Sequence, residues 1–152
     1  HDAVIGVKLA ALGNPNIPTR VIHRMAAGTG KRVRETIAGN ISTPKTILMK
    51  SARDRDTNVA YNVACNPNVP REALTILAER RNIGILVAVV RNKNTPEEAL
   101  AKLARNNNRN LRLLIAEHEN TSRETLEFLL LKAVKEADQK LAETVRLALA
   151  KQ

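Results

Sequence analysis

The segment Gly28-Thr29-Gly30-Lys31 has the residue types of a loop that binds phosphate through backbone N–H groups and a lysine. A phosphate-binding P-loop also needs a glycine five residues before its Gly-Lys pair and a hydroxyl residue directly after it. Met25 and Arg32 occupy those two positions. We therefore interpret the segment as a solvated turn and predict no nucleotide site.

The residues that could bind metal or perform catalysis also lack a suitable pattern. Asp54 and Asp56 alternate with Arg53 and Arg55, whose positive charges oppose cation binding between the carboxylates. The three histidines share no ligand spacing with one another or with the single Cys65. No serine with a histidine and a carboxylate stands out as a nucleophile with its base. We predict a non-enzymatic protein without a metal or another cofactor.

Basic residues do recur at regular points of the chain. Residues 1–112 hold 19 Lys and Arg against 8 Asp and Glu, whereas residues 113–152 hold 6 against 7, which together give the net charge of +10. Phosphates of a DNA or RNA backbone bind such surfaces in a salt-dependent way. The residues expected to form one ridge for a polyanion are Lys31, Arg32, Arg53, Arg55, Arg80, Arg81, Arg105 and Arg109.

Two alternatives stay open for these side chains. They could bind an acidic protein surface, or they could only keep exposed turns soluble. One Tyr, one Phe and no Trp leave few aromatic rings on which bases could stack, so nucleic-acid binding would tolerate any sequence. We expect a scaffold for macromolecular interaction that favours an anionic partner. The alternative is a protein–protein interaction scaffold without a nucleic-acid role.

A repeated turn sequence determines where these residues lie. The turn Asn66-Pro67-Asn68-Val69-Pro70 has counterparts that start at Asn14, Asn40, Asn92 and His118, each 26 residues from the next. A constant interval indicates a repeat architecture, in which equivalent residues stack. We predict one domain, 1–152, that begins inside a longer array. Its units are a partial repeat at 1–13, repeats at 14–39, 40–65, 66–91 and 92–117, and a divergent repeat with a C-terminal cap at 118–152.

Each unit is predicted to contain two helices. Proline at the fifth position favours a helix start, and this first helix should be about ten residues long. In the fourth repeat Thr95 is the expected N-cap, with Glu98 completing a capping box. A second short helix follows the basic connector, because apolar pairs such as Val59 and Val63 lie four residues apart. This periodicity also favours a helix over the β-prone stretch 85–90.

The turns and the last unit carry further expectations. The opening Asn of each unit follows the second helix, where asparagine tolerates a left-handed cap, and the Asn at position three can form an Asx turn. We expect the amides of these asparagines to satisfy backbone groups. His118 should cap its turn in place of Asn. Because the last connector has no helix breaker, we expect a long helical segment over 123–150, which could be a single helix, with a polar outer face.

The pattern N-x-N-x-P, followed by a Leu-Ala helix and a polar turn with V-x-x-x-[VI], resembles the variant leucine-rich repeat family over residues 14–117. The resemblance implies a right-handed superhelix of two alternating helices, one α and one 3₁₀ or short α, without a sheet. HEAT and armadillo units are near 40 residues, longer than these. The expected fold is thus an all-α, right-handed solenoid of 26-residue two-helix repeats with a longer C-terminal capping helix. Without a signal or an apolar run of spanning length, we expect a cytoplasmic location and no membrane partner.

Overall fold

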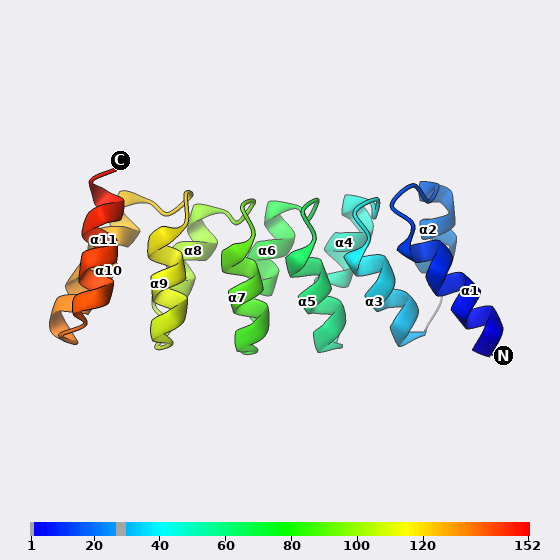
Figure 1. The fold of residues 1–152 in the computed structure, drawn as a ribbon, viewed down its shortest axis with the longest axis horizontal. Helices are drawn as coiled ribbons and strands as arrows, with labels where there is room; N and C mark the ends of the chain where they lie inside the picture. Colours follow the sequence, from blue (N-terminus) through cyan, green and yellow to red (C-terminus); the bar gives the residue numbers. More distant parts are fainter. Residues whose placement is uncertain (1, 27–29) are drawn as a thin grey trace.

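The computed structural model describes residues 2–26 and 30–152, and the side chains of these residues other than 2–5 and 8. The described residues form eleven helices and no strand, and the helices pack in the order of the chain (Figure 1). They are α1 (Asp2–Gly13), α2 (Thr19–Ala26), α3 (Lys31–Gly39), α4 (Lys45–Ser51), α5 (Thr57–Cys65), α6 (Arg71–Leu77), α7 (Ile83–Arg91), α8 (Glu97–Leu103), α9 (Arg109–Glu117), α10 (Arg123–Lys135) and α11 (Gln139–Leu149).

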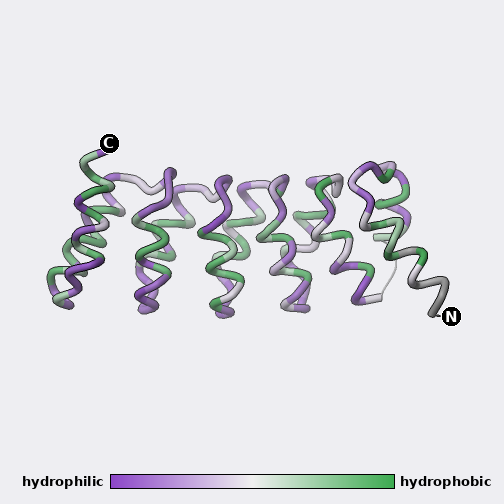
Figure 2. Tube along the Cα trace, in the orientation of Figure 1, coloured by the Kyte–Doolittle hydropathy of each residue, from purple (hydrophilic) through white to green (hydrophobic). Residues whose placement is uncertain are grey.

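The helices form two rows. The odd-numbered helices stand side by side in front in Figure 1, and the even-numbered ones lie behind them. We call the turns at the top of Figure 1 the upper edge, which comprises residues 14–18, 40–44, 66–70, 92–96 and 118–122. The connectors at the bottom form the lower edge, which comprises residues 52–56, 78–82, 104–108 and 136–138. Hydrophilic residues gather at both edges, while hydrophobic residues lie along the helices (Figure 2).

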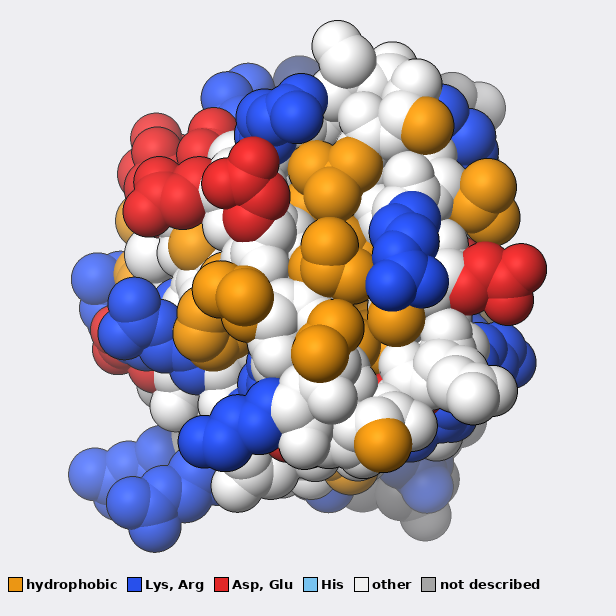
Figure 3. Space-filling model, turned by 90° about the vertical axis from the view of Figure 1, so that its left-hand side faces the viewer, with side chains coloured by type: hydrophobic (Ala, Val, Ile, Leu, Met, Phe, Trp, Pro, Cys, Tyr) orange, Lys and Arg blue, Asp and Glu red, His pale blue; other side chains and the backbone are white. Residues whose placement is uncertain are grey.

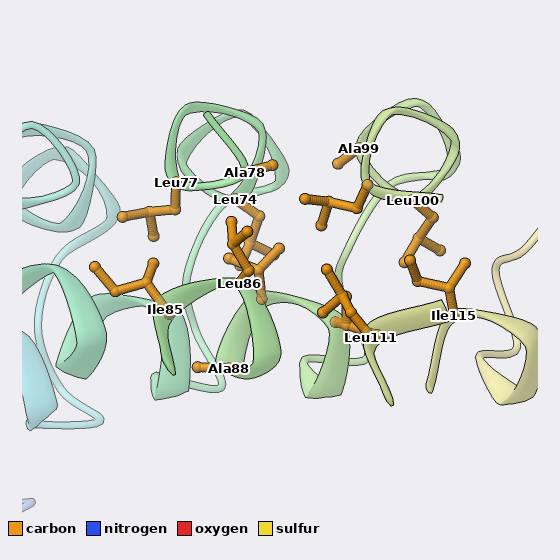
Figure 4. Packing of buried hydrophobic residues seen from close by; sticks show 14 of the residues in the cluster. Leu74, Leu77, Ala78, Ile85, Leu86, Ala88, Ala99, Leu100, Leu111 and Ile115 are labelled. Carbon is orange, nitrogen blue, oxygen red and sulfur yellow. The ribbon is translucent and has the colours of Figure 1, made fainter. Parts of the chain in front are cut away.

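The core lies between the two rows and is aliphatic, as the composition predicts. Leu74 and Leu77 of α6 point toward Ile85 and Leu86 of α7, and Leu100 of α8 points toward α9 (Figure 4). Each such side chain contributes roughly 1.5–3 kcal/mol when it leaves water. The helical interpretation of 85–90 is confirmed, because these residues lie within α7.

The lengths of the two kinds of helix differ from the prediction. α4, α6 and α8 have seven residues each, so the predicted length of about ten is wrong. The preceding prolines, such as Pro70, are N-caps with extended ψ angles and do not belong to the first turn. The second helices α3, α5, α7 and α9 have nine residues each and are α-helices, which answers whether they are α or 3₁₀.

Thr95 does not cap the helix that follows it, so that prediction is also wrong. The residue before a proline is held extended. The hydroxyl of Thr95 reaches back and donates to the carbonyl oxygen of Val89 in α7 at 2.5 Å. Thr121 makes the same bond to Ile115 at 2.6 Å. Thr95 thus joins α7 to α8, and Thr121 joins α9 to α10.

The expected helical segment over 123–150 is present, but it consists of two helices, α10 and α11, and is not unbroken. α10 ends in a Schellman motif, in which Asp138 N–H donates to the Ala133 carbonyl at 2.8 Å and Ala137 N–H donates to that of Val134 at 3.2 Å. Ala137 adopts φ 54°, the left-handed conformation that this motif requires. Asp138 then caps α11 by accepting from Leu141 N–H at 3.0 Å. The expected polar outer face is only partly present, because α10 and α11 expose large hydrophobic side chains beside charged ones.

Candidate anion-binding edge

The opening asparagines of the upper edge are structural. Asn66 Nδ2 donates to the carbonyls of Ala38 and Asn40, both at 2.9 Å, and Asn92 Nδ2 donates to those of Ala64 and Asn66 at 2.8 and 3.1 Å. Asn40 makes the equivalent pair of bonds one turn earlier. These three amides are buried, so they are not available to a ligand. The predicted satisfaction of backbone groups is confirmed.

The same side chains also close their own turns. Asn66 Oδ1 accepts from the N–H of Asn68 at 2.9 Å, an Asx turn. Asn66 has φ −71° and Asn92 has φ −82°, so neither uses the left-handed conformation that asparagine would tolerate there. His118 caps its turn as predicted, since its Nδ1 accepts from Asn120 N–H at 3.0 Å. The remaining nitrogen, Nε2, then carries the proton and donates to the Asn92 carbonyl at 3.1 Å.

The predicted ridge residues lie at the lower edge or on the first turns of the helices that leave it. Four of them are exposed and make no side-chain hydrogen bond or ion pair with the described residues: Arg32, Arg55, Arg81 and Arg105. Arg53 is also exposed, and its guanidinium lies 3.5 Å from the Met49 carbonyl, too far for a strong hydrogen bond. These five side chains are free to meet a ligand. Gly28 and Thr29 of the glycine-rich segment lie outside the described residues.

Two other ridge residues are held in ion pairs. Lys31 Nζ lies 3.0 Å from Asp56 and 3.6 Å from Glu35. Its hydrogen bond to Asp56 raises the pKa of the lysine and lowers that of the aspartate. Arg109 donates twice to Asp138, at 2.6 and 2.7 Å, which lowers the pKa of Asp138. An anionic partner would have to compete with these carboxylates.

Arg80 serves the fold directly. Its Nη2 donates to the carbonyls of Ala52 and Asp54 at 3.0 and 2.6 Å. These acceptors lie 28 and 26 residues earlier, the same offsets that the upper-edge asparagines use. Arg80 therefore fastens one lower-edge connector to the preceding one, and only its neighbour Arg81 is free for binding.

The structure gathers part of the ridge around one hollow. Arg53 and Arg55 line an open depression of about 990 Å³ between α2 and α4, together with Lys50, His23 and Arg34. Arg34 binds Asp54 at 2.7 Å. Burial by itself raises the pKa of Asp54, but the bond from Arg34 and the Asp56 N–H leave it lowered. Lys50 is a new member of the site, because it lies in the last turn of α4 and so outside the connector positions that were expected to form the ridge.

The remaining ridge residues do not converge on this hollow. Arg81, Arg105 and Arg109 follow further along the lower edge toward the C-terminal end. A second open hollow, about 770 Å³, lies at the upper edge and is lined in part by Lys45, Arg71 and Lys93. Sequence analysis did not single out these three residues, and they supply a comparison surface of the same charge.

Arg112 is a basic residue outside the predicted ridge, and the structure buries it. It is 4% exposed, its Nη2 lies 2.5 Å from Glu136, and its Nη1 donates to the Asn106 carbonyl at 3.2 Å. The Nε of Arg112 has no hydrogen-bond partner among the described atoms. A buried guanidinium of this kind cannot reach a ligand, so it joins α9 to the last connector instead.

Fold and surface together define an all-α protein whose helices pack sequentially in a repeat-like manner and whose lower edge carries free arginines. Comparisons of the chain with protein-family models, with curated proteins and with solved structures found no match. Within the described residues, no helix combines the length and the hydropathy needed to cross a bilayer. The same residues contain no cluster of three or more His, Cys, Asp or Glu side chains that could hold a metal ion.

Proposed function

We propose that the chain is a right-handed solenoid of 26-residue units, each with a first helix, a basic connector and a second helix, of the variant leucine-rich-repeat type. The support comes from hydrogen bonds that recur at one interval: Asn40, Asn66 and Asn92 all donate to carbonyls 28 and 26 residues earlier. Alternation of seven- and nine-residue helices from α4 to α9 agrees with it. In such an array equivalent side chains line up along an edge.

The proposed function is that of a non-enzymatic scaffold that binds the phosphate backbone of DNA or RNA along the lower edge. The observation that carries it is the set of exposed arginines without internal partners, joined by Arg53 and Lys50 at the basic hollow. Each basic side chain that contacts a phosphate releases a condensed counterion, which makes binding favourable at low salt. Charge excess in the first 112 residues adds long-range attraction.

Binding of this kind would read charge and shape, and it would not read base sequence. The only aromatic side chains, Tyr61 and Phe128, lie on α5 and α10 and away from the lower-edge connectors. Base stacking therefore contributes little, and no aromatic side chain stands beside the arginines. We expect similar affinity for unrelated sequences of equal length.

The test compares two triple variants that change charge equally. Arg53→Glu/Arg55→Glu/Arg81→Glu alters the lower edge, and Lys45→Glu/Arg71→Glu/Lys93→Glu alters the upper edge; each lowers the net charge from +10 by 6, to +4. Fluorescence anisotropy of labelled 20-nucleotide DNA and RNA is measured at 50 and 200 mM NaCl. The lower-edge variant should lose at least about 30-fold in affinity and show a shallower salt slope, while the upper-edge variant should lose only a few-fold.

Equal losses in both variants would show that net charge alone attracts the polyanion, and the assignment to the lower edge would fall. Absence of binding by the unaltered protein, or affinity indifferent to salt, would overturn the nucleic-acid proposal. Thermal unfolding of both variants, which should match the parent protein within a few degrees, separates lost binding from lost fold.

A second candidate partner is an acidic protein surface. Its support is that three of the eight ridge residues are not free, because Lys31, Arg80 and Arg109 are engaged internally. Separate positive points suit spaced carboxylates better than a continuous phosphate backbone. Selective binding of polyglutamate over DNA of equal charge in the same assay would favour this candidate.

A further inference from the structure

The C-terminal end of the molecule exposes a hydrophobic surface. Figure 3 views this end and shows hydrophobic side chains across its middle, with Lys and Arg side chains both beside them and toward the border and with Asp and Glu farther out. The exposed fractions of the large side chains on α10 are 39% for Phe128, 73% for Leu131 and 63% for Val134, while Leu147 of α11, 60% exposed, lines a separate hollow with residues of α9. A terminal helix of a helical array normally turns a polar face to solvent. This face is therefore expected to be covered by a partner.

Three of these side chains form a symmetric strip along α10. At about 100° per residue, Phe128 and Val134 lie on either side of Leu131, within a sector of roughly 120°. Glu127 and Lys135 lie in the same sector, four residues before and four after Leu131. A rotation of α10 by 180° about an axis that passes through Leu131 perpendicular to the helix therefore exchanges the positions of Phe128 and Val134. The same rotation exchanges the positions of the acidic Glu127 and the basic Lys135.

The surface beside the strip is hollowed at one end. A depression of about 570 Å³ between α10 and α11 is walled by Ala133, Val134, Ala137 and Ala142, with charged residues at its border. Phe128, the only phenylalanine of the chain, projects at the opposite end of the strip. In the antiparallel arrangement the ring of Phe128 faces the neighbourhood of Val134, which is this hollow.

We propose that the end face formed by α10 and α11 binds a second copy of this chain, with the two α10 helices antiparallel and crossing at Leu131. Such a two-fold interface contains every contact twice. Each Phe128 fills the hollow of the other copy, and each Glu127 pairs with Lys135 of the other copy. Phenylalanine in an apolar hollow is the kind of anchor on which interface affinity depends.

Electrostatic repulsion between two copies is weak at the C-terminal end, because the net charge there is close to zero. Residues 113–152 carry 6 basic and 7 acidic side chains, a net charge of −1, while residues 1–112 carry +11. Pairing through the C-terminal faces keeps the two strongly basic regions far apart. It also leaves both lower edges accessible, so the inference does not depend on nucleic-acid binding.

Sedimentation equilibrium of the whole chain tests the proposal. We expect a reversible dimer at concentrations on the order of 100 µM or below. Leu131→Glu should raise the dissociation constant at least about 100-fold, because the charge would lie at the centre of the apolar contact. Ile83→Glu is the matched control, since Ile83 is 45% exposed on α7 and outside the face. It should leave dimerisation unchanged.

A charge exchange tests the orientation. Glu127→Lys alone places two lysines together across the interface, and Lys135→Glu alone places two glutamates together, so each variant should dimerise about tenfold more weakly than the parent. In an equimolar mixture of the two variants, a heterodimer places a lysine of one copy opposite a glutamate of the other at both contacts. The mixture should therefore form heterodimers more tightly than either variant forms homodimers. A monomeric parent protein, association that survives Leu131→Glu, or a mixture no tighter than its components would overturn the proposal.

Discussion

At the upper edge, Asn40, Asn66 and Asn92 close their turns with one set of hydrogen bonds, whereas at the lower edge equivalent positions hold different residues with different bonds. Arg80 donates to the preceding connector, while Asn106 accepts from Asn108 N–H of its own turn. The difference shows at which turns the residue type can vary. The three buried asparagines satisfy corresponding backbone groups in the same way, whereas the exposed connectors vary and so can carry binding residues.

The largest effect is expected from Asn66→Ala at the upper edge. The substitution leaves the carbonyls of Ala38 and Asn40 without their buried donor and removes the Asx turn. We expect a loss of about 2–4 kcal/mol in the free energy of unfolding, measured with urea. Asn68→Ala is the control, because the exposed amide of Asn68 makes one bond to the Ile41 carbonyl, worth about 1 kcal/mol or less. Equal effects of both changes would remove the distinction between buried and exposed amides.

Arg80 binds the preceding lower-edge connector with the same residue offsets that the upper-edge asparagines use, so its removal should also lower stability. Arg80→Ala removes two charge-assisted hydrogen bonds to backbone carbonyls, and we expect it to cost about 1–2 kcal/mol of stability. Arg81→Ala should stay within about 0.5 kcal/mol of the parent protein. In the nucleic-acid assay the order should reverse, with Arg81→Ala the more damaging. Similar stability for both variants would mean that Arg80 does not fasten the connectors.

The last lower-edge turn offers a change that should stabilise the protein. Ala137 has φ 54°, which glycine adopts without the clash that a Cβ causes. Ala137→Gly is expected to raise the free energy of unfolding by about 0.5–1 kcal/mol. Ala101→Gly within α8 should instead lower it by a similar amount, because there glycine only adds backbone entropy to the unfolded chain. Calorimetry of both variants checks the opposite signs.

The smallest effect near neutral pH is expected from Asp138, and it grows only in acid. The hydrogen bonds from Arg109 and the Leu141 N–H lower the pKa of Asp138 in the folded protein. Its stabilising contribution is therefore fully present above the ordinary pKa of about 4 and is lost as pH falls through the lower folded value. Asp138→Asn keeps a capping oxygen and should flatten part of this acid loss, as measured by urea unfolding at several pH values from 7 to 2. An unchanged acid profile would contradict the role of this pair.

Much of the fold could be predicted because its causes are local and periodic. Apolar side chains four residues apart place 85–90 in a helix despite their β-prone composition, and the structure agrees. Thr95 was misassigned because its partner, the Val89 carbonyl, belongs to the preceding helix and is not evident from the Thr-Pro-Glu-Glu pattern. The break at Ala137 was missed for a similar reason, since alanine is not a usual left-handed residue and only the packing of α11 against α9 and α10 requires it there.

The candidate site was predicted less completely. Arg53 and Arg55 were predicted from their place in the sequence to lie in an exposed connector, and both line the basic hollow. Position could not tell that Arg80 and Arg109 are engaged, because Asp138 lies 29 residues from Arg109 and the acceptors of Arg80 are backbone atoms of another turn. Lys50 joins the hollow from a helix end, where sequence alone gives no sign of a shared surface.

By itself, the sequence determined that this protein is helical, that its core is aliphatic and that its charge is concentrated in the first 112 residues, because periodicity, side-chain volume and charge are properties of the residues themselves. Tertiary structure alone decided which basic side chains are free and which are bound, and that the C-terminal end exposes large hydrophobic side chains. The physical reason is that hydrogen bonds, ion pairs and exposure depend on distances between residues of different turns, which the order of residues does not specify.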